Sequence, residues 1–389
     1  MASPGTALTY DLTTGVKLNV ENIIWILTPS DVPWQGTYND TTNLPPESQR
    51  AQRSVLADSS GEITNKKFEW QEDTLLTART TLGATCVTAD TYITLASGQQ
   101  KRFSTGNVIL VDSEHLRITG YGTTADTLTI SRTYGSGETA AQHSNAATVL
   151  GTGTALIEGA DPENFRFTDI STAFNITQIL GPELIKVSAS EQAISLKGGY
   201  FGVTNQFSRQ VMKKMREMLV TFEQAINYGV RVEDTTNDWR TMGGFLYYIT
   251  TNVDSTTTAI SYTAFTTQAQ NAYTNGGQVN TFAVAPSQKV KMSSFDAASI
   301  RLARADSIRG QIVDVIVTDF GECDIMLNRH LRTADAIGID KQWVDLATLR
   351  PLVMQPLAKT GDSDKVQIVG EKTMRVRMQT RHFRFSALA

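Results

Sequence analysis

Cysteine is nearly missing from this chain of 389 residues, which contains only Cys86 and Cys323. No second thiol lies near either of them in the sequence, so the chain has neither a disulfide framework nor a cysteine set for zinc. This usage fits a reducing compartment. Histidine is also scarce, and the four histidines form no HExxH or HxxxH motif. A zincin-like metal site is therefore excluded.

A basic excess and long apolar runs are lacking as well. Lysine and arginine total 35 against 39 aspartates and glutamates, which gives a formal net charge of −4. Proteins whose main role is nucleic-acid binding usually carry a strong basic excess, because phosphate neutralisation supplies most of their affinity. No apolar run approaches the roughly 18 residues that span a bilayer, and the start has no signal-peptide pattern. We therefore expect no sequence-specific nucleic-acid binding and no membrane partner.

The chain does contain enough apolar residues for a substantial folded body. Hydrophobic residues make up 40% and charged residues 19% of the sequence, which are the proportions of ordinary globular proteins. The length leaves room for two or three domains.

Aromatic and acidic residues are concentrated in the stretch KFEWQEDTL at 67–75. In an extended strand Glu69 and Asp73 share a face but lie about 13 Å apart, at a rise of about 3.3 Å per residue. Glycosidase carboxylate pairs are separated by roughly 5 to 9.5 Å. Phe68 and Trp70 point to the opposite face, where they can pack. We therefore expect a structural strand, and no catalytic residue, cofactor or metal.

The first 83 residues have the pattern of extended, projecting structure. Residues 1–40 mix short apolar pieces with proline and glycine, and we interpret them as an arm. Residues 41–62 are polar, contain two prolines and end near a Ser-Ser-Gly turn signal. They lead into the strand at 65–76. The sequence predicts a long β-hairpin made of these two segments.

The sequence pattern is different in residues 84–158. Short β-rich runs such as NVILVD and DTLTISRTYG alternate with Gly, Ser and Asp turns at close spacing. This pattern predicts a small all-β barrel or sandwich. Its flanks are rich in small residues, as expected for a module inserted into a loop of a host domain.

Residues 205–233 predict a long amphipathic helix. Apolar side chains recur at three- and four-residue steps, for example at Phe207, Val211, Met215 and Met218. Its polar side is crowded with basic residues. They form either a solvated face or a surface for acidic groups of a neighbour, and they are Arg209, Lys213, Lys214 and Arg216.

The residues after TMGG at 241–244 predict mixed α and β structure. Residues 262–274 have a helical pattern, and TFAVAPSQ at 281–288 predicts a buried strand. A short helix is expected at 293–305, followed by a strand–turn–strand. The C-terminal part predicts two or three strands with alternating buried and polar positions.

The order of these blocks resembles the major capsid proteins of tailed bacteriophages with the HK97 fold. The most specific parts are EWQEDTL and LAKTGDSDKVQIVGEKT. The resemblance implies an α+β capsid fold with an inserted small all-β barrel or sandwich module. It implies these parts: an N-terminal arm at 1–40, an E-loop hairpin at 41–83, the inserted module at 84–158, a P domain at 159–240 with a spine helix at 205–232, an A domain at 241–345, and a C-terminal return to the P domain at 346–389.

The resemblance also implies a function. Copies of the chain would assemble as hexamers and pentamers of an icosahedral head shell around double-stranded DNA, with portal and scaffolding or decoration proteins as further partners. The protein would be assembled in the host bacterial cytoplasm and reside in the virion. The subunit-interface candidates are Lys67, Phe68, Glu69, Trp70, Asp73, Arg209, Lys213, Lys214 and Arg216. A tail-tube, neck or decoration protein, or a glycan-binding surface protein, is the alternative.

Overall fold

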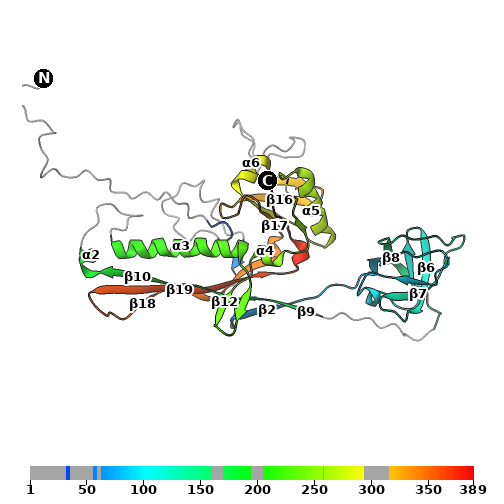
Figure 1. The fold of residues 1–389 in the computed structure, drawn as a ribbon, viewed down its shortest axis with the longest axis horizontal. Helices are drawn as coiled ribbons and strands as arrows, with labels where there is room; N and C mark the ends of the chain where they lie inside the picture. Colours follow the sequence, from blue (N-terminus) through cyan, green and yellow to red (C-terminus); the bar gives the residue numbers. More distant parts are fainter. Residues whose placement is uncertain are drawn as a thin grey trace, which may run out of the picture. The chain divides into compact units, whose positions relative to one another are not determined.

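The computed structural model describes residues 32–35, 56–58, 63–159, 170–193, 205–256, 258–292 and 315–389. They form two compact units, each with its own hydrophobic core (Figure 1). Unit 1 comprises the described residues within 1–70 and 173–389, and unit 2 comprises those within 71–172. Most of the predicted arm at 1–40 and the helix expected at 293–305 lie outside the described residues.

The long helix α3 (Gln206–Tyr228) belongs to unit 1. The Asn205 side chain caps its start by accepting a hydrogen bond from the backbone N–H of Phe207, at 2.8 Å. The predicted helix is confirmed, although it ends at Tyr228, five residues before the end of the predicted range 205–233. At Gly229 a Cβ would lie 2.5 Å from the carbonyl oxygen of Ala225. Only glycine allows the chain to pass this close to the helix end.

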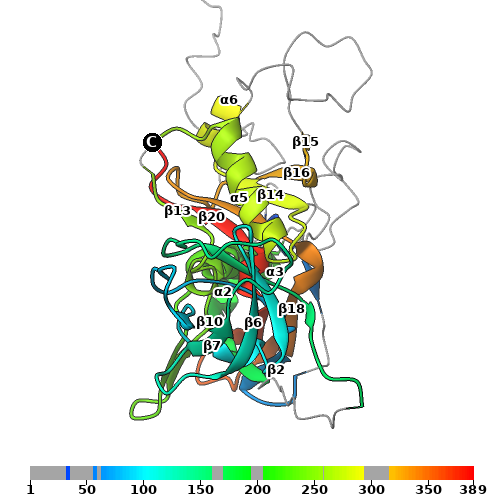
Figure 2. The ribbon, with the colours of Figure 1, turned by 90° about the vertical axis from the view of Figure 1, so that its right-hand side faces the viewer.

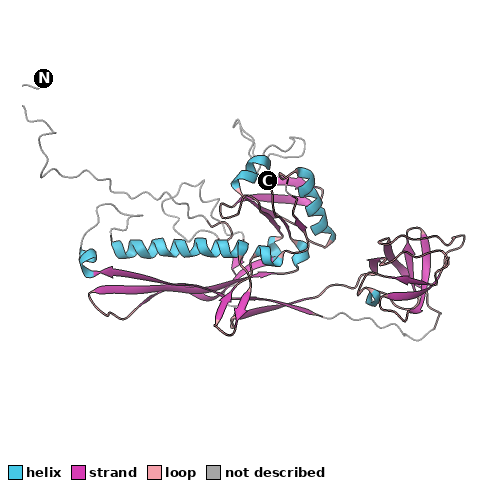
Figure 3. Ribbon diagram, viewed as in Figure 1, coloured by secondary structure: helices cyan, strands magenta, loops and turns pink. Residues whose placement is uncertain are grey.

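Helix α3 packs on a four-stranded sheet in the order β1-β18-β19-β10 (Figure 3). Strand β19 pairs antiparallel with β18 and β10, whereas β1 is parallel to β18. The buried face of the helix, with Met218, Phe222 and Ile226, shares one core with Ile185 and Ile368 of the sheet. The elements are β1 (Ala57–Asp58), β10 (Gln178–Ser188), β18 (Val344–Pro356), β19 (Ser363–Val376), and the short helices α2 (Ala189–Ala193) and η3 (Lys341–Trp343).

The second sheet of unit 1 has six strands in the order β13-β20-β17-β14-β16-β15. Helices α5 and α6 lie beside it (Figure 2), and Phe265 of α5 packs edge-on against Phe282 and Phe383 of the sheet. The elements are α4 (Phe245–Tyr248), β13 (Val253–Asp254), α5 (Tyr262–Thr274), β14 (Thr281–Val284), α6 (Pro286–Met292), β15 (Val315–Thr318), β16 (Gly321–Leu327), β17 (Ala336–Ile339), η4 (Gln379–Arg381) and β20 (Phe383–Phe385).

Several local predictions for this region are confirmed. Helix α5 spans the expected residues 262–274, and all four residues of β14 are buried. Strands β15 and β16 form the expected strand–turn–strand as an antiparallel pair. The chain end differs from expectation, because β20 joins the six-stranded sheet and does not return to the sheet under α3. The Phe383 and Phe385 side chains explain this placement, since both are buried in the aromatic core of that sheet.

The strand predicted at 65–76 is present as β2 (Lys67–Glu72), but its partner is not the expected one. It pairs with β9 (Ser171–Ile176) in a two-stranded ribbon. The Thr177 N–H donates to the Lys66 carbonyl (2.8 Å) and the Ser171 hydroxyl to the Glu72 carbonyl (2.9 Å), so the strands run antiparallel. The prediction that the strand at 65–76 forms a hairpin with residues 41–62 is therefore wrong for β2, which pairs with β9. Residues 36–55 and 59–62 lie outside the described residues.

Unit 2 is a single antiparallel sheet of six strands in the order β3-β8-β5-β6-β7-β4. Its two edges meet: Leu82 bridges to Leu95, and the Gly83 N–H donates to the Thr94 carbonyl at 2.9 Å. A Cβ on Gly83 would lie 2.4 Å from the Leu95 carbonyl oxygen. Glycine therefore permits the sheet to close at this seam. The elements are β3 (Arg79–Thr81), β4 (Tyr92–Thr94), η2 (Gln100–Arg102), β5 (Asn107–Val111), β6 (Glu114–Tyr121), β7 (Thr127–Ser131) and β8 (Thr148–Thr154).

Candidate functional site

The aromatic face of β2 is buried inside unit 1. Phe68 is 9% exposed and Trp70 is 6% exposed, and their ring centroids lie 6.1 Å apart. Phe68 packs with Ile63 and Ala347, and the Trp70 ring lies 6.2 Å from that of Tyr248. The predicted alternation along the strand is confirmed. The chain's own residues cover both rings, so these two interface candidates are core residues of the subunit.

The opposite face of β2 is exposed. Lys67 and Glu69 form an ion pair with each other, and the Lys67 ammonium lies 4.1 Å from the centroid of the Phe174 ring in β9. Asp73, just after β2, accepts a hydrogen bond from the backbone N–H of Thr74 (2.8 Å). The three charged candidates therefore already have partners in their own chain.

The basic candidates on α3 are also engaged within the subunit. Lys214 contacts Glu217 at 2.8 Å and Glu183 of β10 at 3.6 Å, and Lys213 contacts Glu217 at 3.8 Å. Arg209 donates to the side chain of Gln206, and Arg216 lies partly buried on the same helix. Exposed ion pairs of this kind contribute only about 0–1 kcal/mol to stability. The basic side of α3 is therefore a largely self-neutralised surface.

Truncating the aromatic face of β2 should destabilise the subunit. We expect Trp70→Ala to lower the free energy of unfolding by about 3–5 kcal/mol, because it removes a buried tryptophan and leaves a cavity. Urea denaturation of the unassembled chain measures this change. The matched control is Glu69→Ala, whose side chain is half exposed and which should change stability by less than about 0.5 kcal/mol. Equal effects would contradict the assignment of Trp70 to the core.

The sequence patterns did not predict the contact between residues 32–35 and α3. Trp34 is fully buried, and its ring centroid lies 5.0 Å from that of Phe245. Its backbone N–H donates to Glu223 Oε1 (2.9 Å), and its indole Nε1–H donates to Asn227 Oδ1 (2.8 Å). Gln35 adds hydrogen bonds to the Leu219 carbonyl (2.9 Å) and to Glu223 Oε2 (3.1 Å). Residues 32–35 are thus anchored by polar and apolar contacts together.

Glu223 is the centre of this anchor and is fully buried. Burial raises its pKa to about 7, although hydrogen bonds from Trp34, Gln35 and Asn328 act in the opposite direction. Asn328 Nδ2 lies 3.2 Å from Oε1. The folded state therefore holds the proton of Glu223 more tightly than the unfolded chain does, whose ordinary value is near 4.5. The contribution of Glu223 to stability is complete below pH 4.5 and is lost as the pH rises to about 7.

Replacing Glu223 should flatten this pH dependence. For the parent chain we expect the free energy of unfolding to fall between pH 4.5 and 7 by at most about 1.4 kcal/mol per pH unit from this group. Glu223→Gln should remove that slope, because the amide does not titrate. Urea denaturation at a series of pH values measures it. Glu217→Gln, at an exposed position of the same helix, is the control and should keep the slope of the parent chain.

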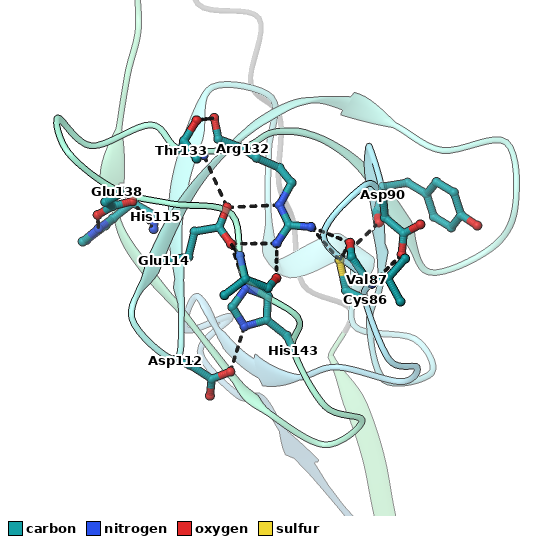
Figure 4. A network of polar contacts seen from close by, with 12 residues as sticks. Cys86, Val87, Asp90, Asp112, Glu114, His115, Arg132, Thr133, Glu138 and His143 are labelled. Atoms are coloured by element: carbon teal, nitrogen blue, oxygen red, sulfur yellow. Dashed lines mark hydrogen bonds and ion pairs between the residues drawn. The ribbon is translucent and has the colours of Figure 1, made fainter.

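A buried polar network occupies the interior of unit 2 (Figure 4). Glu114 and His143 are each 1% exposed. Arg132 holds the Glu114 carboxylate through Nε (3.1 Å) and Nη2 (2.7 Å). His143 lies between two carboxylates, 2.8 Å from Asp112 and 3.0 Å from Glu114. Burial alone would raise the pKa of Glu114, but these hydrogen bonds and one from the Ala141 N–H lower it to about 2.

The geometry of this network indicates a role in stability and not in catalysis. Both ring nitrogens of His143 are occupied by carboxylates. The Cys86 thiol is 2% exposed, its pKa is raised by burial, and its contact with Arg132 is 3.8 Å long. The thiol contacts the Val87 and Tyr92 carbonyls and Arg132, none of which is a general base. In the part of the chain that the structure describes, no group of three or more potential ligands is placed to hold a metal ion.

The network should determine the stability of unit 2. We expect Glu114→Gln to cost about 3–5 kcal/mol, because Arg132 is left as a buried charge without its partner. The folded-state pKa is depressed, so the contribution of the parent Glu114 is present above pH 4.5 and is lost as the pH falls toward 2. Scanning calorimetry of the full chain at pH 7 and pH 3 measures both effects. The exposed Glu158→Gln is the control; an equal shift there would contradict this role.

No described helix is long and apolar enough to cross a membrane. The chain has an α+β fold with a long helix on one sheet and a second, mixed sheet, and solved capsid proteins share this fold. A capsid protein of a native GTA particle superimposes with a TM-score of 0.53 at 10% identity, covering 100% of both chains. A chain from Mycobacterium phage Adephagia gives a TM-score of 0.43 at 10% identity, covering 86% of this chain and 88% of that one. No curated protein matches the sequence.

The family model described as SU10 major capsid protein matches residues 5–389. The chain therefore belongs to that family and is a major capsid protein: its copies self-associate into the head shell of a phage, and it resides in the virion. The match spans both units. It favours the capsid function over a tail-tube, neck, decoration or glycan-binding protein, and it places the chain in a family of structural proteins.

Proposed function

We propose that the shell built by this protein is icosahedral, made of hexamers and pentamers, and encloses the double-stranded DNA of a tailed phage. The family match over residues 5–389 carries this proposal. The net charge of −4 supports it, because a mildly acidic shell avoids tight binding to the packaged phosphates. Portal and scaffolding or decoration proteins are the expected partners, and assembly takes place in the host bacterial cytoplasm.

Within this shell, we assign α3 and the four-stranded sheet to the P domain and the six-stranded sheet to the A domain. Residues 1–40 act as the N-terminal arm, and Trp34 anchors part of it on α3. The E-loop is the ribbon of β2 and β9, and the closed sheet of unit 2 is a small barrel inserted between these two strands. Lys67 and Glu69 then lie on the exposed face of the E-loop ribbon, and Asp73 lies just after it. These three residues can contact neighbouring copies.

Electron microscopy of the purified chain tests the shell directly. Closed icosahedral particles are expected, because the family assembles into heads. Open tubes, isolated rings or a stable monomer under all assembly conditions would contradict the proposal.

Excision tests the insertion. We expect that replacing residues 74–169 by a short Gly-Ser bridge leaves unit 1 folded, because β2 and β9 keep their pairing and each unit has its own core. Circular dichroism and a cooperative urea transition of the shortened chain measure this. A control that removes residues 67–176, and with them the ribbon, should lose cooperativity, since Phe68 and Trp70 leave the core. Collapse of unit 1 in both variants would show that the module is not an independent insertion.

A further inference from the structure

The hairpin of β11 (Val232–Asp234) and β12 (Trp239–Thr241) carries an exposed tryptophan. Trp239 is 68% exposed and Val232, on the same face, is 46% exposed. The other face is held to unit 1, because Arg240 contacts Glu371 at 2.6 Å. Leaving an indole in water forgoes the stabilisation that burial of its large apolar area supplies. Of the other tryptophans that the structure describes, Trp34 and Trp70 are buried and Trp343 is partly buried, so Trp239 is the most exposed of the four.

The turn of the hairpin is held by side-chain hydrogen bonds. One carboxylate oxygen of Asp234 accepts hydrogen bonds from the backbone N–H groups of Thr236 (2.8 Å) and Asn237 (3.2 Å), and the other accepts from the Asn237 side chain (2.8 Å). Glu233 is tied to Lys66 at 2.7 Å. Because the turn is preorganised, little conformational entropy is lost when its tip contacts another surface.

Unit 1 also has a groove suited to such a side chain. Its volume is about 500 Å³, and it is lined by Tyr228, Gly229, Val230, Leu246, Tyr247 and Arg332. The Arg332 guanidinium lies 4.8 Å from the centroid of the Tyr228 ring, and its side chain is 64% exposed while Nε donates to the buried Asp335. Tyrosine and arginine, with tryptophan opposite them, are the residues that dominate binding energy at protein interfaces.

We propose that Trp239 of one copy inserts into this groove of the adjacent copy in the ring. The occupant is a second copy because the chain self-associates into a shell, and the inference rests on that function. Charge complementarity favours the same pairing: the exposed Asp238 precedes Trp239 at the tip, and Arg332 lines the groove. The indole and the groove are different surfaces of one chain, so their contact is head-to-tail and can close a ring of identical subunits.

Truncation of the indole tests the contact. We expect Trp239→Ala to raise the subunit concentration needed for shell formation by at least about tenfold, as for a central interface residue, with an unchanged urea transition of the free subunit. Light scattering and electron microscopy measure assembly. The control is Tyr273→Ala, an aromatic residue on α5 that is 58% exposed; it should assemble as the parent chain does. Normal assembly of Trp239→Ala would overturn the inference. Failure of the parent chain to form shells would instead contradict the function.

Cross-linking between two variants locates the occupant. Copies carrying Trp239→Cys are mixed with copies carrying Leu246→Cys, assembled, and treated with a short bis-maleimide. Cys86 and Cys323 are each 2% exposed and give little background. Dimers that form only in the mixture support the insertion. Dimers from Trp239→Cys alone would show a symmetric contact between two tips, and their absence from every assembled sample would show no contact; either result overturns the proposal.

Discussion

Burial of the apolar face of α3 holds unit 1 together, because that face belongs to one hydrophobic core with residues of both larger sheets. Phe222 and Ile226 are fully buried, and their core includes Met374 of the four-stranded sheet and Ile337 of the six-stranded sheet. Apolar burial is the largest favourable contribution to folding, at about 25 cal/mol per Å². A shared core of this kind fixes the two sheets to one rigid helix, which a subunit needs if it is to repeat the same contacts around a shell.

The buried face of α3 also carries two polar residues, and their hydrogen bonds explain why residues 32–35 are attached to the helix. Glu223 and Asn227 are four residues apart and fully buried, so each needs a hydrogen-bonding partner to avoid a cost of about 1–3 kcal/mol. Trp34 donates to both, from its backbone N–H to Glu223 and from its indole N–H to Asn227 Oδ1. Gln35 and Asn328 also donate to Glu223. The segment is therefore held where the helix buries its polar side chains. Fold stability and the position of the arm depend on one set of contacts.

Local sequence patterns predicted the elements of this fold but not the pairings between distant residues. The three- and four-residue spacing along α3 and the apolar run of β14 are local signals, and both elements formed as expected. The pairing of β2 with β9 spans about 100 residues, and nothing in either strand specifies the other. Glu223 and Asn227 within an apolar helix stripe were a readable sign of a buried polar contact, but their partner Trp34 lies some 190 residues away.

Assembly can be driven only by groups that are not already paired or buried in the free subunit. Lys213 and Lys214 already contact Glu217, so a neighbour gains little from them beyond orientation, since exposed charges chiefly set register and association rate. The exposed indole of Trp239 is different, because its apolar area is unburied in the free subunit and is removed from water only on contact. A shell repeats each contact many times, so a modest gain per subunit is sufficient. In the proposed contact, burial of the Trp239 indole supplies favourable free energy, and the exposed charges set the register of the two copies.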